Sequence, residues 1–280
     1  MSIPLSSSPI TRDKVRHDFR ARPVTVAAVS RITTNMIRVT FQGPDLLDFA
    51  SFGPHDHLKL VIPDDTGTAP EPRIIDGRLE RPFDGILRDY TPRFYSTAIR
   101  PPELMIDFFD HDDPGPATAW ARRARPGQMT WILGPRGSAL VPNGAEELLL
   151  FADETALPSI ARWIEMSPGL DITAHVIARG GDRAYLDYLP GAADPSLAAD
   201  PEAPGAPAIV WHEDPASLLA AARAITTVAP TTFVWAGGEA GLLAELRRHL
   251  RTITERPQLS IVGYWRAGEA NYDHHAPLPD

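Results

Sequence analysis

The pattern of apolar residues changes partway along this chain of 280 residues. Up to about residue 141, short segments such as 37–41 and 57–62 alternate apolar with polar side chains, and glycine or proline separates them. This alternation is typical of antiparallel strands that bury one face. Beyond that point, continuous apolar runs such as 148–152 precede segments of helical character such as 157–166. Because buried parallel strands that feed helices have this pattern, the sequence predicts two domains of different fold class.

The first predicted domain, residues 20–141, is an antiparallel β-barrel interrupted by one short helix. Its expected strands are 24–29, 37–41, 57–62, a segment around Tyr90, 104–109 and 129–133. The second, residues 142–280, is a doubly wound parallel α/β sheet. Its expected strands are 148–152, 172–178, 208–211, 232–236 and 260–265, and its expected helices are 157–166, 216–225 and 242–251. We further expect a loose lead-in before about residue 20, a surface excursion at 64–86 and a flexible connection at 190–207.

The composition excludes several classes of function. The 36 acidic and 27 basic residues give a net charge of −9, which opposes binding to nucleic acid or to an anionic membrane. The chain has no cysteine, which excludes disulfides, thiolate metal sites and Cys-ligated iron–sulfur clusters, so redox chemistry would need a bound cofactor. The start of the chain lacks a signal-peptide pattern, and no apolar run reaches the roughly 20 residues of a membrane span. We therefore expect a monomeric, soluble protein of the cytoplasm with no nucleic-acid or membrane partner.

The segment Arg88-Asp89-Tyr90-Thr91-Pro92-Arg93 combines three side chains that suit a flavin. An arginine fork matches a phosphate, a tyrosine ring can lie on the isoalloxazine, and a threonine hydroxyl can reach the ring nitrogens. Downstream, a turn at His111 leads into Gly115-Pro116-Ala117-Thr118, whose main-chain N–H groups could receive a pyrophosphate. Together these segments predict one FAD site. A second Arg-x-Tyr-Ser frame, Arg93-Phe94-Tyr95-Ser96, leaves the choice of flavin contact open.

A nucleotide site is predicted in the second domain. The segment Asp153-Glu154-Thr155-Ala156 lies where the first strand of that domain turns into its helix, at the edge of an open α/β sheet that binds ligands. A plain helix N-cap is the alternative, since Asp and Thr favour such positions. After the second strand, Arg179 and Arg183 favour the 2′-phosphate of NADPH over NADH. Two solvated loop arginines are an equally open interpretation.

Six blocks of sequence, in order along the chain, resemble the siderophore-interacting protein family. They are residues 88–93, 106–111, 115–121, 134–137, 153–158 and 263–266. Members are FAD-containing ferric-siderophore reductases with a ferredoxin-reductase-like fold. The resemblance therefore implies hydride transfer from NADPH or NADH to FAD, followed by single-electron transfer to the Fe(III) of a ferric siderophore. One departure is Ala152, where the family usually has glycine.

The resemblance also implies roles for individual residues. It implies that the cofactor-binding residues are Arg88, Tyr90, Thr91, Arg93, Asp107, His111, Gly115, Pro116, Ala117, Thr118, Asp153, Glu154, Thr155, Ala156, Arg179 and Trp265. Basic side chains hold the siderophore in the family, and the candidates here are Lys59, Arg136 and Arg266. Arg266 is the candidate substitute for an arginine that some members carry where this chain has Ser260. No protein acid or base is required, because the flavin supplies the chemistry.

Two other functions remain open at this point. One is a flavin reductase of the same architecture whose acceptor is a ferredoxin, a quinone or another small oxidant. The other is a non-catalytic carrier of ferric chelates. No metal site is predicted, because neither His55-Asp56-His57 nor His274-His275 has a third ligand nearby in the sequence.

Overall fold

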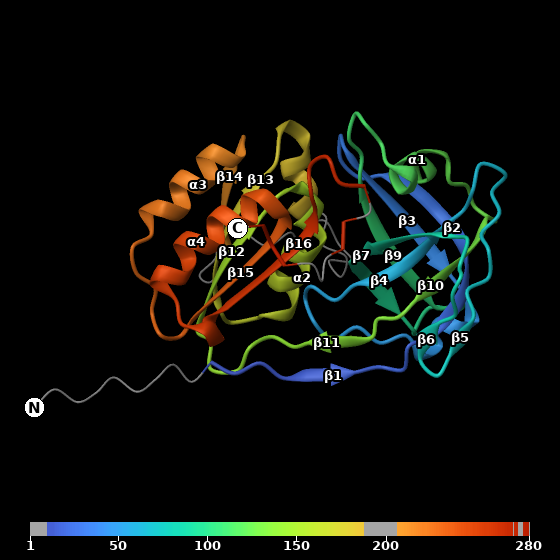
Figure 1. Ribbon diagram of the computed structural model, residues 1–280, viewed down its shortest axis with the longest axis horizontal. Coiled ribbons are helices and arrows are strands. Elements are labelled where there is room, and N and C mark those ends of the chain that lie inside the picture. Colours follow the sequence, from blue (N-terminus) through green and yellow to red (C-terminus); the bar gives the residue numbers. More distant parts are fainter. Residues whose placement is uncertain (1–9, 188–205, 271, 274–276, 280) are drawn as a thin grey trace, which may run out of the picture. The chain divides into compact units, whose positions relative to one another are not determined.

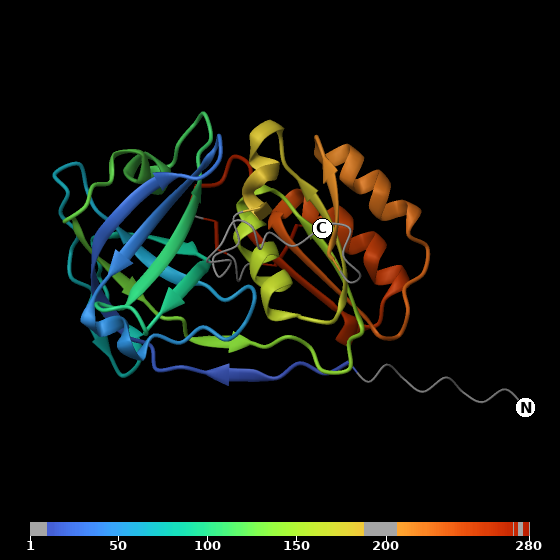
Figure 2. The same ribbon diagram turned by 180° about the vertical axis from the view of Figure 1, so that it is seen from behind.

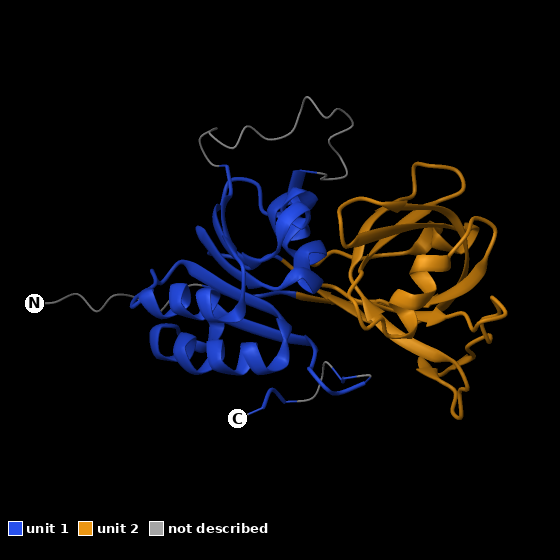
Figure 3. Cartoon of the chain, turned by 90° about the horizontal axis from the view of Figure 1, so that it is seen from above, with its two compact units in different colours: residues 1–13, 141–280 blue, residues 14–140 orange. Residues whose placement is uncertain are grey.

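The computed structural model describes residues 10–187, 206–270, 272–273 and 277–279, and the chain forms two compact units (Figure 3). One unit contains Lys14–Leu140. The other contains residues from Val141 onward together with the N-terminal segment up to Asp13. Most of the predicted connection at 190–207, and the His274-His275 pair, lie outside the described residues. Within the described part of the chain, no helix is both long and apolar enough to cross a membrane.

An antiparallel sheet builds the first unit, in the strand order β7-β4-β10-β2-β3-β9-β8 (Figure 1). The strands are β2 (Ala21–Arg31), β3 (Met36–Gln42), β4 (Leu58–Ile62), β7 (Ile86–Tyr90), β8 (Pro92–Ser96), β9 (Glu103–Phe109) and β10 (Met129–Leu133). Strands β7 and β8 form the two edges of this sheet, yet only Thr91 separates them along the chain. The sheet therefore curls until a single residue joins its edges. The predicted antiparallel barrel is confirmed, but the one strand expected around Tyr90 is in fact two.

Apolar side chains on the concave face of this sheet form the core of the unit. Phe41 and Phe108 are fully buried there, and Trp120 of helix α1 (Pro116–Arg123) covers them. The helix begins at a proline. Proline suits this position because an N–H group in the first turn of a helix would have no partner within the helix. A short 3₁₀ segment, η1 (Pro44–Asp48), adds Leu46 to the same core.

Two short pairings in this unit differ from the sequence expectations. The excursion at 64–86 contains a hairpin of β5 (Ile74–Ile75) and β6 (Arg78–Leu79). The loose lead-in is wrong for β1 (Lys14–Arg16), which pairs with β11 (Gly137–Ala139). A three-residue strand has no recognisable local pattern when its partner lies more than a hundred residues away.

Five parallel strands form the sheet of the second unit, in the order β14-β13-β12-β15-β16. They are β12 (Glu147–Ala152), β13 (Asp171–Ile177), β14 (Ala208–His212), β15 (Thr232–Glu239) and β16 (Leu259–Trp265). Helix α2 (Leu157–Met166) lies on one face, and α3 (Pro215–Ala224) and α4 (Ala240–Ile253) lie on the other (Figures 1 and 2). Short 3₁₀ segments are η2 (Glu154–Ala156), η3 (Gly180–Asp187) and η5 (Arg256–Gln258). The predicted doubly wound parallel sheet is confirmed, and its strand order reverses between β12 and β15.

Candidate functional site

The segment predicted to hold a flavin lies where the curled sheet of the first unit closes. Tyr90 ends β7, and its half-buried ring packs against Phe108 with the ring centroids 4.4 Å apart. Burial raises the pKa of the Tyr90 phenol, and the nearby Arg88 only partly opposes this. The phenol therefore stays protonated and can donate a hydrogen bond. Thr91, between the two edge strands, is buried.

The alternative tyrosine of the second frame lies one strand further along. Tyr95 in β8 is also half-buried and packs edge-to-face against Phe49, with the ring centroids 5.2 Å apart. Since both tyrosines lie on edge strands of the same sheet, the choice of Tyr90 over Tyr95 as flavin contact remains a prediction.

The start of helix α1 offers its main chain to an anion. Gly115 is the N-cap residue, with φ of −65°, and no described side chain caps the helix. A Cβ atom built on Gly115 meets no other atom within 4 Å, so neither backbone conformation nor packing within the chain requires glycine here. Ala117 is buried in the core, and the Thr118 hydroxyl donates to the Phe109 carbonyl at 3.3 Å. Open space before unpaired helical N–H groups is what a pyrophosphate needs.

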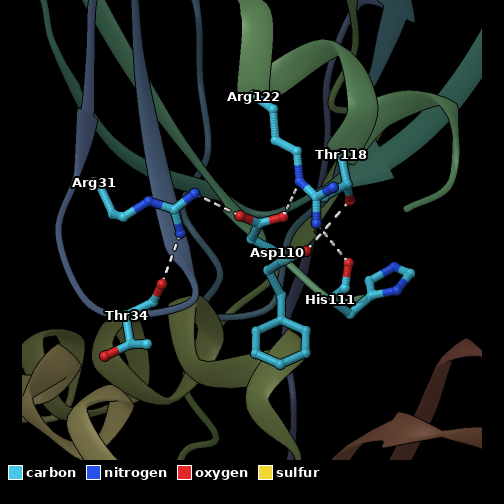
Figure 4. Close-up of polar contacts among 7 residues, drawn as sticks. Arg31, Thr34, Asp110, His111, Thr118 and Arg122 are labelled. Atoms are coloured by element: carbon cyan, nitrogen blue, oxygen red, sulfur yellow. Dashed lines mark hydrogen bonds and ion pairs between the residues drawn. The ribbon is translucent and has the colours of Figure 1, made fainter. Parts of the chain in front are cut away.

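A carboxylate between two arginines fixes the turn that leads into α1 (Figure 4). Asp110 accepts from Arg31 Nη2 at 2.6 Å and from Arg122 Nε at 2.5 Å, and Arg122 also donates to the His111 carbonyl. Burial raises the pKa of Asp110, but the two guanidinium groups outweigh this and hold it below its usual value. The His111 imidazole is exposed and points away from this cluster (Figure 4).

Two predicted cofactor residues lie inside the packing of the first unit. Asp107 is buried, and its two oxygens accept from Nε and Nη2 of Arg38 on the adjacent strand at 2.8 and 2.7 Å. Arg93 is also almost completely buried. The structure thus gives Asp107 a role in pairing β3 with β9, and direct contact of either side chain with FAD stays a prediction.

The two basic candidates of this unit differ in availability. Lys59 Nζ lies 2.8 and 2.9 Å from the two carboxylate oxygens of Asp89. The exposed Arg136 guanidinium stacks over the Phe19 ring, 3.7 Å from its centroid, and donates to the Gly77 carbonyl. Phe19 also lines a cavity of about 720 Å³ whose wall includes Trp131. Arg136 therefore lies beside a cavity, whereas Lys59 already has an anionic partner.

In the second unit, predicted site residues meet at the carboxyl edge of the parallel sheet. Asp153 follows β12 and is buried, and it accepts hydrogen bonds from Thr155, from the Glu239 N–H and from the indole N–H of Trp265. Burial raises the pKa of Asp153, and these hydrogen bonds oppose the rise. The half-buried Glu154 is next to it, and burial raises its pKa to about 7.

The candidate arginines of this unit lie at opposite ends of the carboxyl edge of the parallel sheet. Arg179 follows β13, is exposed and donates through Nε to the Glu213 carbonyl at 3.2 Å. Arg183 forms an ion pair with the Glu213 carboxylate. Beyond β16, Arg266 pairs with Glu269 at 3.3 Å. The hydroxyl of Ser260 accepts from Arg12 at 3.2 Å.

Both units match models of one protein family. Residues 25–139 match the siderophore-interacting FAD-binding domain, and residues 145–268 match the siderophore-interacting protein model. The NADPH-dependent ferric-chelate reductase of Escherichia coli K12 is 31% identical over 274 residues, which cover 94% of this chain and 100% of that protein. The chain belongs to the siderophore-interacting protein family.

Solved structures agree with this family membership. A siderophore utilization protein from T. fusca is 35% identical and superposes with a TM-score of 0.79, covering 95% of this chain and 100% of that one. Phthalate dioxygenase reductase, at 14% identity and a TM-score of 0.61 over 88% of this chain and 68% of that one, shares the fold alone. The predicted family, its ferredoxin-reductase-like fold and FAD as its cofactor are thereby confirmed.

Sequence reasoning missed two features that organise these candidate sites. The clamp of Arg31 and Arg122 on Asp110 joins residues 79 positions apart. The hydrogen bond of Trp265 to Asp153 spans 112 positions. Asp110 is next to the predicted site residue His111 and Asp153 was itself predicted, but no local pattern names a partner so distant in sequence.

Proposed function

We propose that this protein is an FAD-dependent ferric-siderophore reductase that takes electrons from NADPH in preference to NADH. The observation that carries the proposal is the match along nearly the whole chain to a relative named as an NADPH-dependent ferric-chelate reductase. The family model for a siderophore-interacting FAD-binding domain, matched by the first unit, supports the same cofactor and substrate class.

The residues of the first unit suit FAD. The open space in front of Gly115 and the uncapped first turn of α1 fit a pyrophosphate. Arg88, Tyr90 and Thr91 would hold the flavin at the closure of the sheet. When bound, FAD supplies hydride acceptance from the nucleotide and release of the two electrons one at a time.

Substrate docking is assigned to exposed basic side chains. Arg136 is the stronger candidate, because its guanidinium is exposed beside the cavity that Phe19 and Trp131 line. Lys59 would have to exchange Asp89 for the chelate, and Arg266 would have to exchange Glu269. Ferric siderophores often present negatively charged oxygen ligands, which a guanidinium attracts. Fe(II) binds such hard donors less tightly than Fe(III), so reduction releases the iron.

The preference for NADPH rests on Arg179. Its guanidinium is exposed at the carboxyl end of β13, where dinucleotide-binding sheets select between a ribose hydroxyl and a 2′-phosphate. The absence of cysteine suits a reducing compartment, and we propose that a monomeric enzyme acts in the cytoplasm.

A steady-state assay under anaerobic conditions tests the proposal. The FAD-loaded protein is given NADPH or NADH, one ferric catecholate or hydroxamate chelate, and a ferrous trap. We expect trapped Fe(II) to accumulate faster with NADPH, and Arg179→Gln to raise the KM for NADPH roughly tenfold while leaving the KM for NADH unchanged. The matched control Arg78→Gln changes an exposed arginine of the β5–β6 hairpin and should change neither value. No Fe(II) with any chelate would overturn the proposed acceptor, and equal KM changes for both nucleotides would overturn the role of Arg179.

A further inference from the structure

We propose that Asp153 is a positioning residue that holds the Trp265 indole as a fixed stacking platform for the nicotinamide ring of the reductant. The inference rests on the proposed nucleotide-dependent function. In this role the Asp153 side chain forms hydrogen bonds with other residues of the protein and does not contact the cofactor directly.

Asp153 and its hydrogen-bond partners lie at the carboxyl ends of neighbouring strands. Asp153 directly follows β12, Glu239 ends β15 and Trp265 ends β16. The strand order reverses between β12 and β15, and open α/β sheets bind their ligands at the carboxyl ends of strands at such a reversal. The Asp153 carboxylate therefore joins the ends of three neighbouring strands at the expected nucleotide edge.

The hydrogen-bond donors around Asp153 suit a carboxylate. Oδ1 accepts from the Thr155 main-chain N–H at 2.9 Å and from its hydroxyl at 2.5 Å. Oδ2 accepts from the Glu239 N–H at 2.7 Å and from Trp265 Nε1 at 2.9 Å. A carboxylate can accept from all four donors, whereas an amide of the same shape would turn an N–H toward other N–H groups.

The backbone of β15 is shaped around this carboxylate. Gly238 has φ of +145°, and a Cβ atom there would lie 2.6 Å from Asp153 Oδ2. The pairing of β15 with β16 shifts register between Gly238 and Glu239, which places Glu239 opposite Trp265. A glycine with an open backbone conformation thus allows the close approach, and the irregularity re-aims the end of β16.

Trp265 combines a fixed polar atom with an open ring. The residue is 41% exposed, although its indole N–H donates to the buried Asp153. An exposed aromatic ring held in one orientation loses little entropy when a planar heterocycle stacks on it. The end of β13, where Arg179 lies, is three strand spacings away in the sheet order, or roughly 14 Å. A dinucleotide with its 2′-phosphate at Arg179 would thus present its nicotinamide end near Trp265.

Three variants of the FAD-loaded enzyme test the inference. Asp153→Asn keeps the shape of the side chain but faces donors with an amide. Trp265→Phe keeps a ring but removes the N–H, and Trp265→Ala removes the platform. The matched control is Asp64→Asn in the other unit, because Asp64 accepts from the main-chain N–H and the hydroxyl of Thr66 as Asp153 does from Thr155.

Two measurements distinguish a positioning role of Asp153 from an effect on the stability of the protein alone. Calorimetry gives the Kd for NADP⁺, and anaerobic bleaching of the flavin at increasing NADPH gives the nucleotide-dependent reduction rate. We expect roughly tenfold weaker binding for Asp153→Asn and for Trp265→Ala, a smaller loss for Trp265→Phe, and wild-type values for Asp64→Asn. Adding Asp153→Asn to Trp265→Ala should weaken binding no further, because the residue acts through the indole.

The outcomes distinguish this inference from the proposed function. Wild-type nucleotide binding in Asp153→Asn or Trp265→Ala would overturn the inference, as would additive losses in the double variant. If Asp153→Asn fails to fold, unchanged binding in Trp265→Ala still overturns it. Oxidation of chemically reduced enzyme by a ferric chelate should be unaffected in every variant. Failure of that step in the wild type would instead refute the proposed function. The inference would then still be tested by the nucleotide-binding measurements.

Discussion

The half-buried carboxyl group of Glu154 should make nucleotide binding depend on pH. Burial raises its pKa to about 7, nearby acidic side chains add to the rise, and Arg179 opposes it. Above that pH the ionised carboxylate would repel nucleotide phosphates at the same edge of the sheet. We expect the Kd for NADP⁺ to rise as pH increases through about 7, and Glu154→Gln to lose most of this dependence in calorimetric titrations.

The control for this prediction is Glu165→Gln, at the opposite end of α2, where the side chain is exposed. It should keep the wild-type dependence on pH. Identical slopes for all three proteins would show that Glu154 does not face the bound nucleotide.

A buried histidine pair should make the stability of the protein depend on pH. His175 Nδ1 and His212 Nε2 lie 3.0 Å apart, and the rings stack between strands β13 and β14. Burial lowers the pKa of His175 from 6.5 to about 4, and His212 adds to this. Since the unfolded chain binds protons more readily, the free energy of unfolding is maximal above about pH 6.5 and falls as the pH drops toward 4.

Urea unfolding at several pH values measures this effect. His175→Phe, which can still stack on Phe151, should lose part of the acid sensitivity between pH 6.5 and 4, a range given by the shift of His175. The control is His249→Phe. His249 forms a hydrogen bond with the Ile225 carbonyl and is not part of the pair. If His175→Phe unfolds with the same pH dependence as the wild type, the pair is not the cause.

At the scale of single elements, the turn between β9 and α1 depends on one carboxylate. Asp110 is buried and accepts charge-assisted hydrogen bonds from Arg31 and Arg122. Replacing it by asparagine should lower the free energy of unfolding by about 2 kcal/mol. Because the helix start that follows would lose its fixed position, FAD should also dissociate several-fold faster. Fluorescence of released flavin measures that rate.

Asp48→Asn is the matched control. Asp48 also accepts from two arginines, Arg20 and Arg22, in the same unit, but it lies in η1 rather than beside α1. Its loss should lower stability without faster FAD release. Equal rates of FAD release for both variants would show that the hydrogen bonds of Asp110 do not hold the flavin site in place.

Elements with a strong local pattern were predictable from the sequence. Helix α2 spans Leu157–Met166 as predicted, because a buried strand, an N-terminal proline and apolar spacing all mark it. The division at Thr91 was not predictable, since only one residue separates β7 from β8 and the two strands differ in their pairing partners, β4 and β9. Strand β1 was missed for the related reason that only its distant partner stabilises it.

The candidate sites were predictable in composition but not in contacts. The resemblance to the family named Asp153 and Trp265 separately, and parallel-sheet topology placed the Asp153 segment at a carboxyl edge. Their hydrogen bond depends on the register shift at Gly238, which no sequence pattern reports. Likewise Lys59 lies between the buried Leu58 and Leu60 in β4, but its ion pair with Asp89 depends on the pairing of β4 with β7.

At the scale of the whole molecule, the two units divide the chemistry. The residues proposed to hold FAD all belong to 14–140, whereas those proposed to bind the nucleotide belong to 141–280. The proposed electron transfer assigns no side chain of either set the role of acid or base. The proposed function therefore depends on cofactor loading and on the order in which the donor and the ferric chelate react.

Anaerobic stopped-flow absorbance on the FAD-loaded protein tests this account most directly. The enzyme is first mixed with NADPH and then with a ferric siderophore and a ferrous trap. The account predicts that the flavin bleaches, that its absorbance returns on addition of the siderophore, and that two Fe(II) ions are trapped for each flavin reoxidised, because one hydride carries two electrons. A flavin that bleaches with NADPH but stays reduced in the presence of every ferric chelate would contradict it.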